Sequence, residues 1–227
     1  MRIIGVGQDG KIRFDDVLDH GVDPAALAHD HGFLAIRPID VVRDDHSELV
    51  LRLMVRPQTG EHRPPIRPRG QDAGLVLTPD RPPIVRQRVA GYAVVLSRRG
   101  LLATEFSDRT AIAGRWGMPG GGLDDHERPE AAVLREVREE TSQVIHLGEL
   151  TKVHTSRWIG RNPRGDIEDF HAVRLIYRAH CETPTDPVVL DSDGTTRSAR
   201  WIPLAKWRTL HWTQNWREVL FELLTET

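Results

Sequence analysis

Residues 119–142, PGGGLDDHERPEAAVLREVREETS, join three glycines to a segment rich in glutamate and arginine. Pro129 suits the first turn of a helix, because its missing N–H is not needed there and its φ is already helical. The residues after it, AAVLREVREE, favour helices. The stretch therefore predicts a glycine loop that leads into a short charged helix.

One face of this helix carries three carboxylates. At about 100° per residue, Glu136, Glu139 and Glu140 fall within an arc of roughly 100°. Arg135 precedes Glu139 by one turn and can pair with it at i,i+4. The helix thus combines a concentration of negative charge with one arginine that partly offsets it.

An apolar stripe of Val133, Leu134 and Val137 is predicted to seat the helix on the core. An ordinary surface helix with cross-linked charges explains the helix taken alone. However, the like charges of Glu136 and Glu140 at i,i+4 cost stability unless a cation lies between them. Carboxylate oxygens suit Mg²⁺ or Mn²⁺, and glycines let the backbone approach a ligand closely.

The spacing in this segment resembles the Nudix box. The match spans residues 121–144 and follows the order Gly121, five residues, Glu127, seven residues, Arg135, Glu136, Val137, one residue, Glu139 and Glu140. So many fixed positions make the resemblance specific. The order of elements predicted between residues 88 and 227 is also similar to that of a Nudix domain.

Two departures from the box are present. Ser142 and Gln143 stand where the family normally has a glycine and an aliphatic residue, and His126 replaces a small residue before Glu127. A glycine after Thr141 would allow a left-handed helix end, so we expect Ser142 to reshape this exit. Neither departure removes an acid.

The resemblance implies an α/β fold, namely a Nudix α-β-α sandwich with a mixed sheet. It also implies hydrolysis of a nucleoside diphosphate linked to another moiety, with Mg²⁺ or Mn²⁺ as the cofactor. Carried over by position, the metal ligands would be Glu136 and Glu140. Glu139 and the carbonyl of Gly120 would be further ligands.

The resemblance also assigns supporting roles. Glu127 and Arg135 would support the ligands, and Glu139 is alternatively the partner through which Arg135 holds the helix to the loop. A carboxylate would accept the proton of the attacking water, and Glu139, Glu136 or an acid of a later loop is the candidate. Glu136, Glu139 and Glu140 are therefore the predicted catalytic residues.

Later parts of the chain offer further candidates. The late-loop acids that could accept the proton are Glu168, Asp169, Asp191 and Asp193. Turn chemistry explains each of them equally well. Trp158 and Phe170 are candidates for stacking a base, although buried aromatic residues usually belong to the core. Arg157 is a candidate for phosphate binding, with a solvated loop as the alternative.

The chain is predicted to divide into three parts. Residues 1–56 form a small α+β N-terminal extension, residues 57–86 a linker rich in proline and arginine, and residues 87–227 the Nudix domain. Within the extension, residues 15–29 are predicted to form a helix between strands. Because so short a piece is marginal as an independent domain, we expect it to pack on the larger domain or on another subunit.

Two patterns in the extension are predicted to be structural only. Residues 5–10, GVGQDG, match the dinucleotide-binding pattern G-x-G-x-x-G. Strand-like sequence follows them, and Asp9-Gly10 is a turn signal, so we expect a hairpin. His20, His29 and His31 fit no single helical face, and we expect them in surface loops.

The composition is ordinary for a globular protein, with 39% hydrophobic residues and a formal net charge of −2 over 227 residues. Because no basic excess is present, a nucleic-acid partner is not expected. Cys181 is the only cysteine, and no stretch reaches the length of a membrane span. We therefore expect a cytoplasmic protein with a nucleotide-type small-molecule partner and no membrane, and a homodimer stays open.

The leading hypothesis is metal-dependent hydrolysis of a pyrophosphate bond by attack of water on phosphorus. Nucleoside triphosphates, nucleotide sugars and other pyrophosphates are all open as substrates, because no secondary subfamily marker stands at its expected place. The alternative is a non-catalytic nucleotide-binding sensor on the same scaffold. The complete set of acids in the box disfavours that alternative.

Overall fold

The computed structural model describes residues 1–60, 69–78, 80–110, 112–162, 164–191 and 194–225. The chain forms two compact units. The first unit consists of Met1–Ala90 and Leu150–Ile176, and the second unit consists of Gly91–Glu149 and Tyr177–Thr227. The strands that contribute residues to both units are β6 (Ile84–Ser97), β10 (His146–Arg161) and β11 (Ile167–His180).

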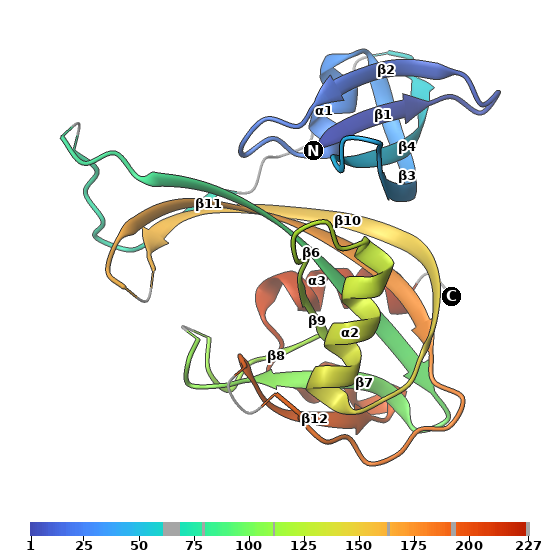
Figure 1. Cartoon of the computed structure of the whole chain (residues 1–227), viewed down its shortest axis with the longest axis vertical. Helices are drawn as coiled ribbons and strands as arrows, with labels where there is room; N and C mark the ends of the chain where they lie inside the picture. Colours follow the sequence, from blue (N-terminus) through green and yellow to red (C-terminus); the bar gives the residue numbers. More distant parts are fainter. Residues whose placement is uncertain (61–68, 79, 111, 163, 192–193, 226–227) are drawn as a thin grey trace. The chain divides into compact units, whose positions relative to one another are not determined.

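The N-terminal part of the first unit is a four-stranded sheet with one helix (Figure 1). Its elements are β1 (Arg2–Val6), β2 (Ile12–Val17), α1 (Pro24–Asp30), β3 (Phe33–Arg43) and β4 (Leu49–Pro57). The strand order is β2-β1-β4-β3, with β1 antiparallel to β2 and parallel to β4. Ile3, Val41 and Leu51 are almost completely buried. The predicted small α+β extension is confirmed.

The glycine pattern of residues 5–10 lies in the hairpin between β1 and β2. Gly10 has a φ of +76°, and its N–H donates to the carbonyl of Gly7 over 2.9 Å. The chain then returns along β1, with Gly5 opposite Phe14. The hairpin prediction is therefore confirmed, because the chain turns back as a strand where a dinucleotide site would need a helix.

The predicted helix at residues 15–29 is wrong at its start. Asp15 and Val17 still belong to β2, and a turn follows in which the N–H of Val22 donates to the carbonyl of Asp19. The helix α1 begins only at Pro24, after Asp23 accepts a hydrogen bond from the N–H of Ala25. Residues 15–17, whose local sequence also permits a helix, thus form the end of β2 because they pair with β1.

The predicted linker contains regular structure. β5 (Arg69–Gln71) pairs in parallel with residues 157–159 of β10, which ties this segment to the first unit. Residues 61–68 of the predicted linker lie outside the described residues. The predicted division of the chain at residues 57 and 87 stays a prediction.

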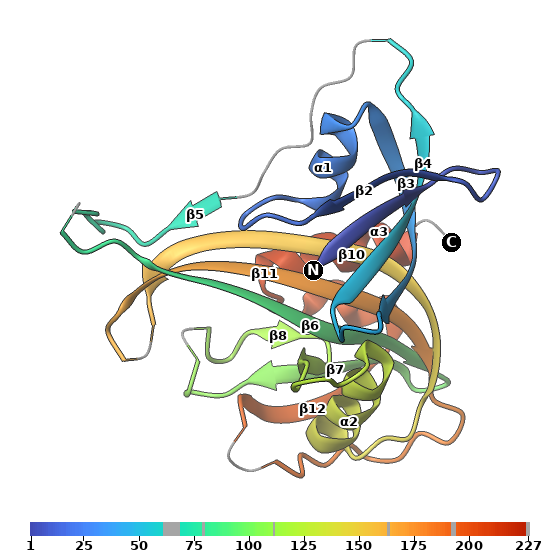
Figure 2. The same ribbon diagram turned by 45° about the horizontal axis from the view of Figure 1, so that its top comes forward.

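The second unit is a sheet with a helix on each face (Figures 1 and 2). Its strands follow the order β12-β7-β6-β11-β10, with β8 beside β7 and β9 beside β6. Its remaining elements are β7 (Gly100–Phe106), β8 (Trp116–Gly117), β9 (Gly120–Gly122), α2 (Pro129–Thr141), β12 (Thr196–Ile202), the 3₁₀-helix η1 (Leu204–Thr209) and α3 (Gln214–Thr225). The predicted α/β architecture is confirmed.

The core of the second unit lies between the sheet and these helices. Its side chains include Val95, Leu102, Val137 and Leu220, which are all fully buried. Among the described residues, no helix is both long and apolar enough to cross a membrane.

Candidate functional site

The helix α2 sits on the sheet through small and branched residues. Ala132, Val133 and Val137 are completely buried, so this face packs against the core. Leu134 is 43% exposed, and its predicted place in the apolar stripe is wrong. It lies about 100° round the helix from Val133, beyond the edge of the packed face. The packing turns the carboxylate face of α2 toward the glycine loop.

Two glycines of β9 bring the backbone close to α2. Gly120 has a φ of +142°, and a Cβ atom there would lie 2.2 Å from the carbonyl oxygen of Gly91. A Cβ atom on Gly121 would lie 2.5 Å from the carboxylate of Glu136. Position 120 requires glycine because the added atom would meet backbone, whereas at position 121 it would displace the carboxylate of Glu136. The glycine run therefore serves close approach as well as turning.

Glu140 is held by two hydrogen bonds. Its Oε2 accepts from the N–H of Gly120 over 2.9 Å, and its Oε1 accepts from the hydroxyl of Thr196 on β12. Burial, together with the negative charges of Glu136 and Asp191, raises the pKa of Glu140 to about 7, although the two hydrogen bonds oppose the shift. A positive charge brought to this carboxylate would relieve that shift.

Arg135 joins the loop to the helix. It donates from Nε and Nη2 to the two carboxylate oxygens of Glu127 over 3.0 and 2.9 Å. Its Nη1 donates to Glu136 over 2.9 Å and to Glu139 over 3.1 Å, and its Nη2 also reaches the carbonyl of Gly122. These carboxylates raise the pKa of Arg135, so the guanidinium stays charged. The predicted pairing of Arg135 with Glu139 is present.

The carboxylates differ in exposure. The side chain of Glu136 is 18% exposed and that of Glu139 is 43% exposed. In the part of the chain that the structure describes, no group of three or more aspartate, glutamate, histidine or cysteine side chains is arranged to hold a metal ion. The fit to a divalent cation rests instead on the hard oxygen donors of Glu136 and Glu140, the space left by Gly121, and the raised pKa of Glu140.

The helix ends where the sequence departs from the box. Ser142 adopts the left-handed conformation, with a φ of 58° and a ψ of 10°, which is the helix end that a glycine would allow, so the expected reshaping of this exit is wrong. Gln143 is buried, with 2% exposure. His126 also has a positive φ of 63°. None of these residues displaces an acid from the site.

Arg157 and Asp169, two predicted site residues, pair with each other in the first unit. Arg157 donates from Nε to Asp169 over 2.7 Å and makes a second contact from Nη2. The same carboxylate lies 3.0 Å from Nε2 of His20, and Nδ1 of the buried His171 accepts from the N–H of Gly21. His20 thus lies in a loop, as predicted, but it is half-buried in a polar cluster and not on the surface.

The other predicted residues of the first unit also have intramolecular contacts. Trp158 covers Gly70, and its indole N–H donates to Asp72 over 3.1 Å. Glu168 accepts from the side chain of Asn162, and Phe170 is half-buried. Asp193 lies outside the described residues. The roles predicted for these residues stay predictions.

Two cavities lie in the second unit. One, of about 620 Å³, is lined by Ile112, Arg115, Trp212, Thr213, Gln214, Arg217 and Glu218. Within the described residues, the guanidinium groups of Arg115 and Arg217 make no hydrogen bond or ion pair. Arg115 immediately precedes β8, which leads through Met118 and Pro119 to Gly120. This cavity therefore offers two available cations, Arg115 next to the strand that enters the glycine loop and Arg217 on α3.

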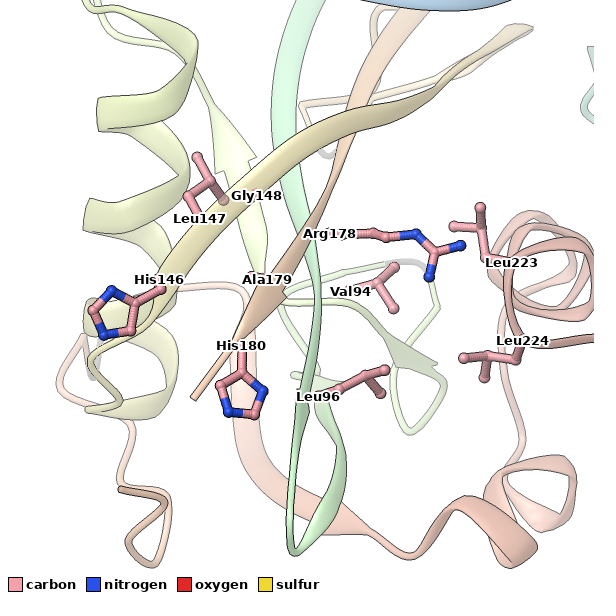
Figure 3. A pocket seen from close by; sticks show the side chains of 10 residues that line it. All are labelled: Val94, Leu96, His146, Leu147, Gly148, Arg178, Ala179, His180, Leu223 and Leu224. Atoms are coloured by element: carbon pink, nitrogen blue, oxygen red, sulfur yellow. The ribbon is translucent and has the colours of Figure 1, made fainter. Parts of the chain in front are cut away.

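The second cavity, of about 440 Å³, lies between the sheet and the end of α3 (Figure 3). Its walls are mainly apolar, including Val94, Leu96 and Leu223. His146, Arg178 and His180 contribute the polar side chains, and no acidic side chain lines it. This cavity has no carboxylate ligands for a hard divalent cation, so the acidic site is the one near Glu140.

Thr196, Arg115 and Arg217 were not predicted from the sequence. Thr196 reaches Glu140 only because β12 pairs with β7. No local pattern marks such a long-range partner. The two arginines were indistinguishable in the sequence from the many other arginines of the chain.

Comparison with known proteins gives consistent results. The protein-family model described as NUDIX domain matches residues 86–224. Nucleoside triphosphatase NudI of Escherichia coli O139:H28 is 41% identical over 51 residues, which are 22% of this chain and 36% of that protein. The chain thus spans about a third of the length of the curated relatives it matches.

One solved structure supports the fold. The MutT protein from Methanosarcina mazei Go1 matches with a TM-score of 0.50 at 17% identity, over 62% of this chain and 94% of that chain. This similarity shows a common fold. The MutT NUDIX hydrolase from Burkholderia pseudomallei is 28% identical with a TM-score of 0.46, over 61% of this chain and 98% of that chain.

Proposed function

Because this chain belongs to the Nudix family, we propose that it hydrolyses a pyrophosphate bond in a nucleoside diphosphate-linked substrate with Mg²⁺ or Mn²⁺. The observation that carries the proposal is the convergence of two carboxylates on the glycine loop. Glu140 accepts from the N–H of Gly120, and the carboxylate of Glu136 lies against Gly121. A buried acid with a pKa near 7 beside a second acid is a costly arrangement that a divalent cation would stabilise.

Glu136 and Glu140 are the proposed main ligands, with Glu139 and the carbonyl of Gly120 as further ones. When bound, a divalent cation neutralises the charge of a pyrophosphate and favours ionisation of water. Thr196 and the N–H of Gly120 fix the orientation of Glu140.

Arg135 performs the corresponding role for the other acids. By contacting Glu127, Glu136 and Glu139 together, it keeps the loop and the helix in register. Glu139 is more exposed than Glu136, and we assign it the role of accepting a proton from the attacking water.

The cavity at Arg115 and Arg217 is the proposed place for the rest of the substrate. Its volume of about 620 Å³ lies within the range of small-molecule sites. Arginine suits phosphate because its planar fork can donate two parallel hydrogen bonds. Since one relative is a nucleoside triphosphatase, nucleoside triphosphates are the first class to test, ahead of nucleotide sugars.

The experiment is a substrate screen with the full chain. Nucleoside triphosphates and nucleotide sugars are incubated with Mg²⁺ or Mn²⁺, and release of phosphate, pyrophosphate and nucleoside monophosphate is measured. We expect hydrolysis that requires the divalent cation and stops with a chelator. Tight binding of a nucleotide without turnover in any condition would instead support the non-catalytic sensor, which no observation in the structure favours.

A further inference from the structure

The segment Thr185–Asp191 runs along the C-terminal turn of α2. The N–H of Leu190 donates to the carbonyl of Glu139 over 2.7 Å, and the N–H of Val188 donates to the carbonyl of Thr141 over 3.2 Å. The last carbonyls of a helix have no partner within the helix. This segment supplies partners for two of them and is therefore part of the helix end.

Gln143 anchors the start of this segment. Its Oε1 accepts from the N–H of Thr185 over 3.0 Å. Its Nε2 donates to the hydroxyl of Thr185 and to the carbonyl of Thr141, each over 3.0 Å. The carbonyl of Thr185 accepts from the indole N–H of Trp201 over 2.9 Å. An aliphatic residue at position 143 could form none of these amide contacts.

Ser142 contributes a second contact. Its hydroxyl accepts from the N–H of Val188 over 3.2 Å, a contact that a glycine at this position would lack. The left-handed backbone of Ser142 is the conformation that directs the chain away from α2. Ser142 and Gln143, two of the residues that depart from the box, therefore both hydrogen-bond to the segment Thr185–Asp191.

The segment ends at Asp191, next to the acidic site. The N–H of Asp191 is 3.4 Å from the carbonyl of Glu139, the residue before Glu140. Its negative charge acts on Glu140 together with that of Glu136. Position 191 is thus fixed relative to the carboxylates by backbone contacts with α2.

We propose that Gln143 is a positioning residue that anchors Thr185–Asp191 and thereby holds Asp191 close to Glu140, where its charge strengthens binding of a divalent cation. The cation in this inference rests on the proposed function. The anchoring itself is independent of it. The expected effect is electrostatic, because a carboxylate near a cation adds attraction without touching the substrate.

The test is a titration of the full chain with Mn²⁺, followed by the electron paramagnetic resonance signal of the free ion. We expect Gln143→Leu and Asp191→Asn each to weaken Mn²⁺ binding, by roughly tenfold for a supporting residue. The double variant should bind Mn²⁺ no more weakly than the weaker-binding single variant. Gln143→Leu releases the segment that holds the charge of Asp191 and Asp191→Asn removes that charge, so both changes eliminate the same interaction. Additive losses, or unchanged affinity in Gln143→Leu, would overturn the proposal.

Hydrogen exchange supplies a readout that needs no metal. In Gln143→Leu, the amides of Val188 and Leu190 should exchange faster, while those in the middle of α2 keep their protection. Thr185→Val, which removes a hydroxyl from an exposed residue, tests the same anchor if Gln143→Leu does not fold, and Thr185→Ser is the matched control. Slow exchange at these amides in the folded variants would contradict the anchoring.

The two proposals fail in different ways. If the wild-type chain binds no Mn²⁺, the proposed function is wrong and the role of Asp191 falls with it, while the exchange data still decide whether Gln143 anchors the segment. If wild type binds Mn²⁺ and hydrolyses nucleotides but Asp191→Asn binds Mn²⁺ equally well, only the inference about Asp191 is wrong.

Discussion

The backbone N–H of Gly120 donates to the carboxylate of Glu140 over 2.9 Å, across 20 residues of sequence. The bond joins the glycine loop to the last turn of α2. It exists because Gly120 adopts a φ of +142° at a place where a Cβ atom would collide with Gly91. The loop and the acidic helix therefore form one structural element, and a change in either should affect both.

Gly121→Ala should impair the site without unfolding the protein. The new Cβ atom would lie 2.5 Å from the carboxylate of Glu136, so the acid must move. We expect at least about a tenfold loss in Mn²⁺ affinity, as for a displaced ligand support. Gly10→Ala is the control, because nothing lies within 4 Å of the atom added there. Equal loss of Mn²⁺ affinity in both variants would count against this explanation.

Metal binding should depend on pH through Glu140. Because its pKa is raised to about 7 by burial, the carboxylate is partly protonated at neutral pH, and a cation must displace that proton. Mn²⁺ affinity should therefore rise with pH up to and through about 7. Without metal, the folded state binds this proton more tightly than the unfolded chain. The free energy of unfolding should therefore decrease as the pH rises from about 4.5 to about 7.

Thr196→Val should move this pH dependence. The hydroxyl of Thr196 favours the charged form of Glu140, so its removal should raise the pKa of Glu140 further. The midpoint of the Mn²⁺ affinity profile should shift to higher pH, while Thr196→Ser should keep it. Calorimetry in two buffers of different ionisation enthalpy measures the proton released. A profile that does not move in Thr196→Val would refute the assignment.

Asp169→Asn should destabilise the first unit. The carboxylate is nearly buried, and Arg157 with His20 lowers the pKa of Asp169 to about 2. Loss of its charge leaves the half-buried Arg157 unpaired, which costs more than the roughly 1 kcal/mol of an exposed pair and less than the roughly 3 kcal/mol of a buried one. Asp40→Asn is the matched control, because Asp40 pairs with Arg52 through the same two nitrogen types at an exposed site, worth less than about 1 kcal/mol. Urea unfolding measures both.

The stability contributed by the ion pair of Asp169 and Arg157 should also depend on pH. Because the folded pKa lies below that of the unfolded chain, near 3.8, its contribution to stability is complete above that value. It is lost as the pH falls from about 3.8 to about 2. Asp169→Asn should lack this component of acid denaturation.

His171 should make the folded state sensitive to mild acid. Burial lowers the pKa of His171 to about 4, and its Nδ1 accepts from the N–H of Gly21, which requires the neutral ring. The unfolded chain takes up this proton near 6.5, so stability should fall as the pH drops from about 6.5 to about 4, by on the order of 3 kcal/mol. His171→Gln should flatten this slope in urea unfolding measured at several pH values.

Local sequence carried most of the information about the acidic helix. Pro129 marked its start, and the fixed spacing of the box brought Gly121 and Glu136 together. These features depend on residues close in sequence, where periodicity and backbone preference are sufficient.

Long-range partners were beyond such reasoning. The helix expected from Asp15 became a strand because β1 pairs with it. Asp169, a candidate for proton transfer, pairs with Arg157 and contacts His20 of the distant extension. Such outcomes depend on which strands meet, and one sequence contains no local signal for that choice.

The measurement that tests the central claim most directly is the rate of hydrolysis by Glu140→Gln. With the best substrate of the screen and saturating Mg²⁺, we predict a loss of at least about a hundredfold in kcat, with the melting temperature of the apo protein retained. Glu149→Gln, on an exposed residue of the same unit, should keep the wild-type rate. A folded Glu140→Gln protein with wild-type Mg²⁺-dependent turnover would contradict the claim that this carboxylate holds the catalytic cation.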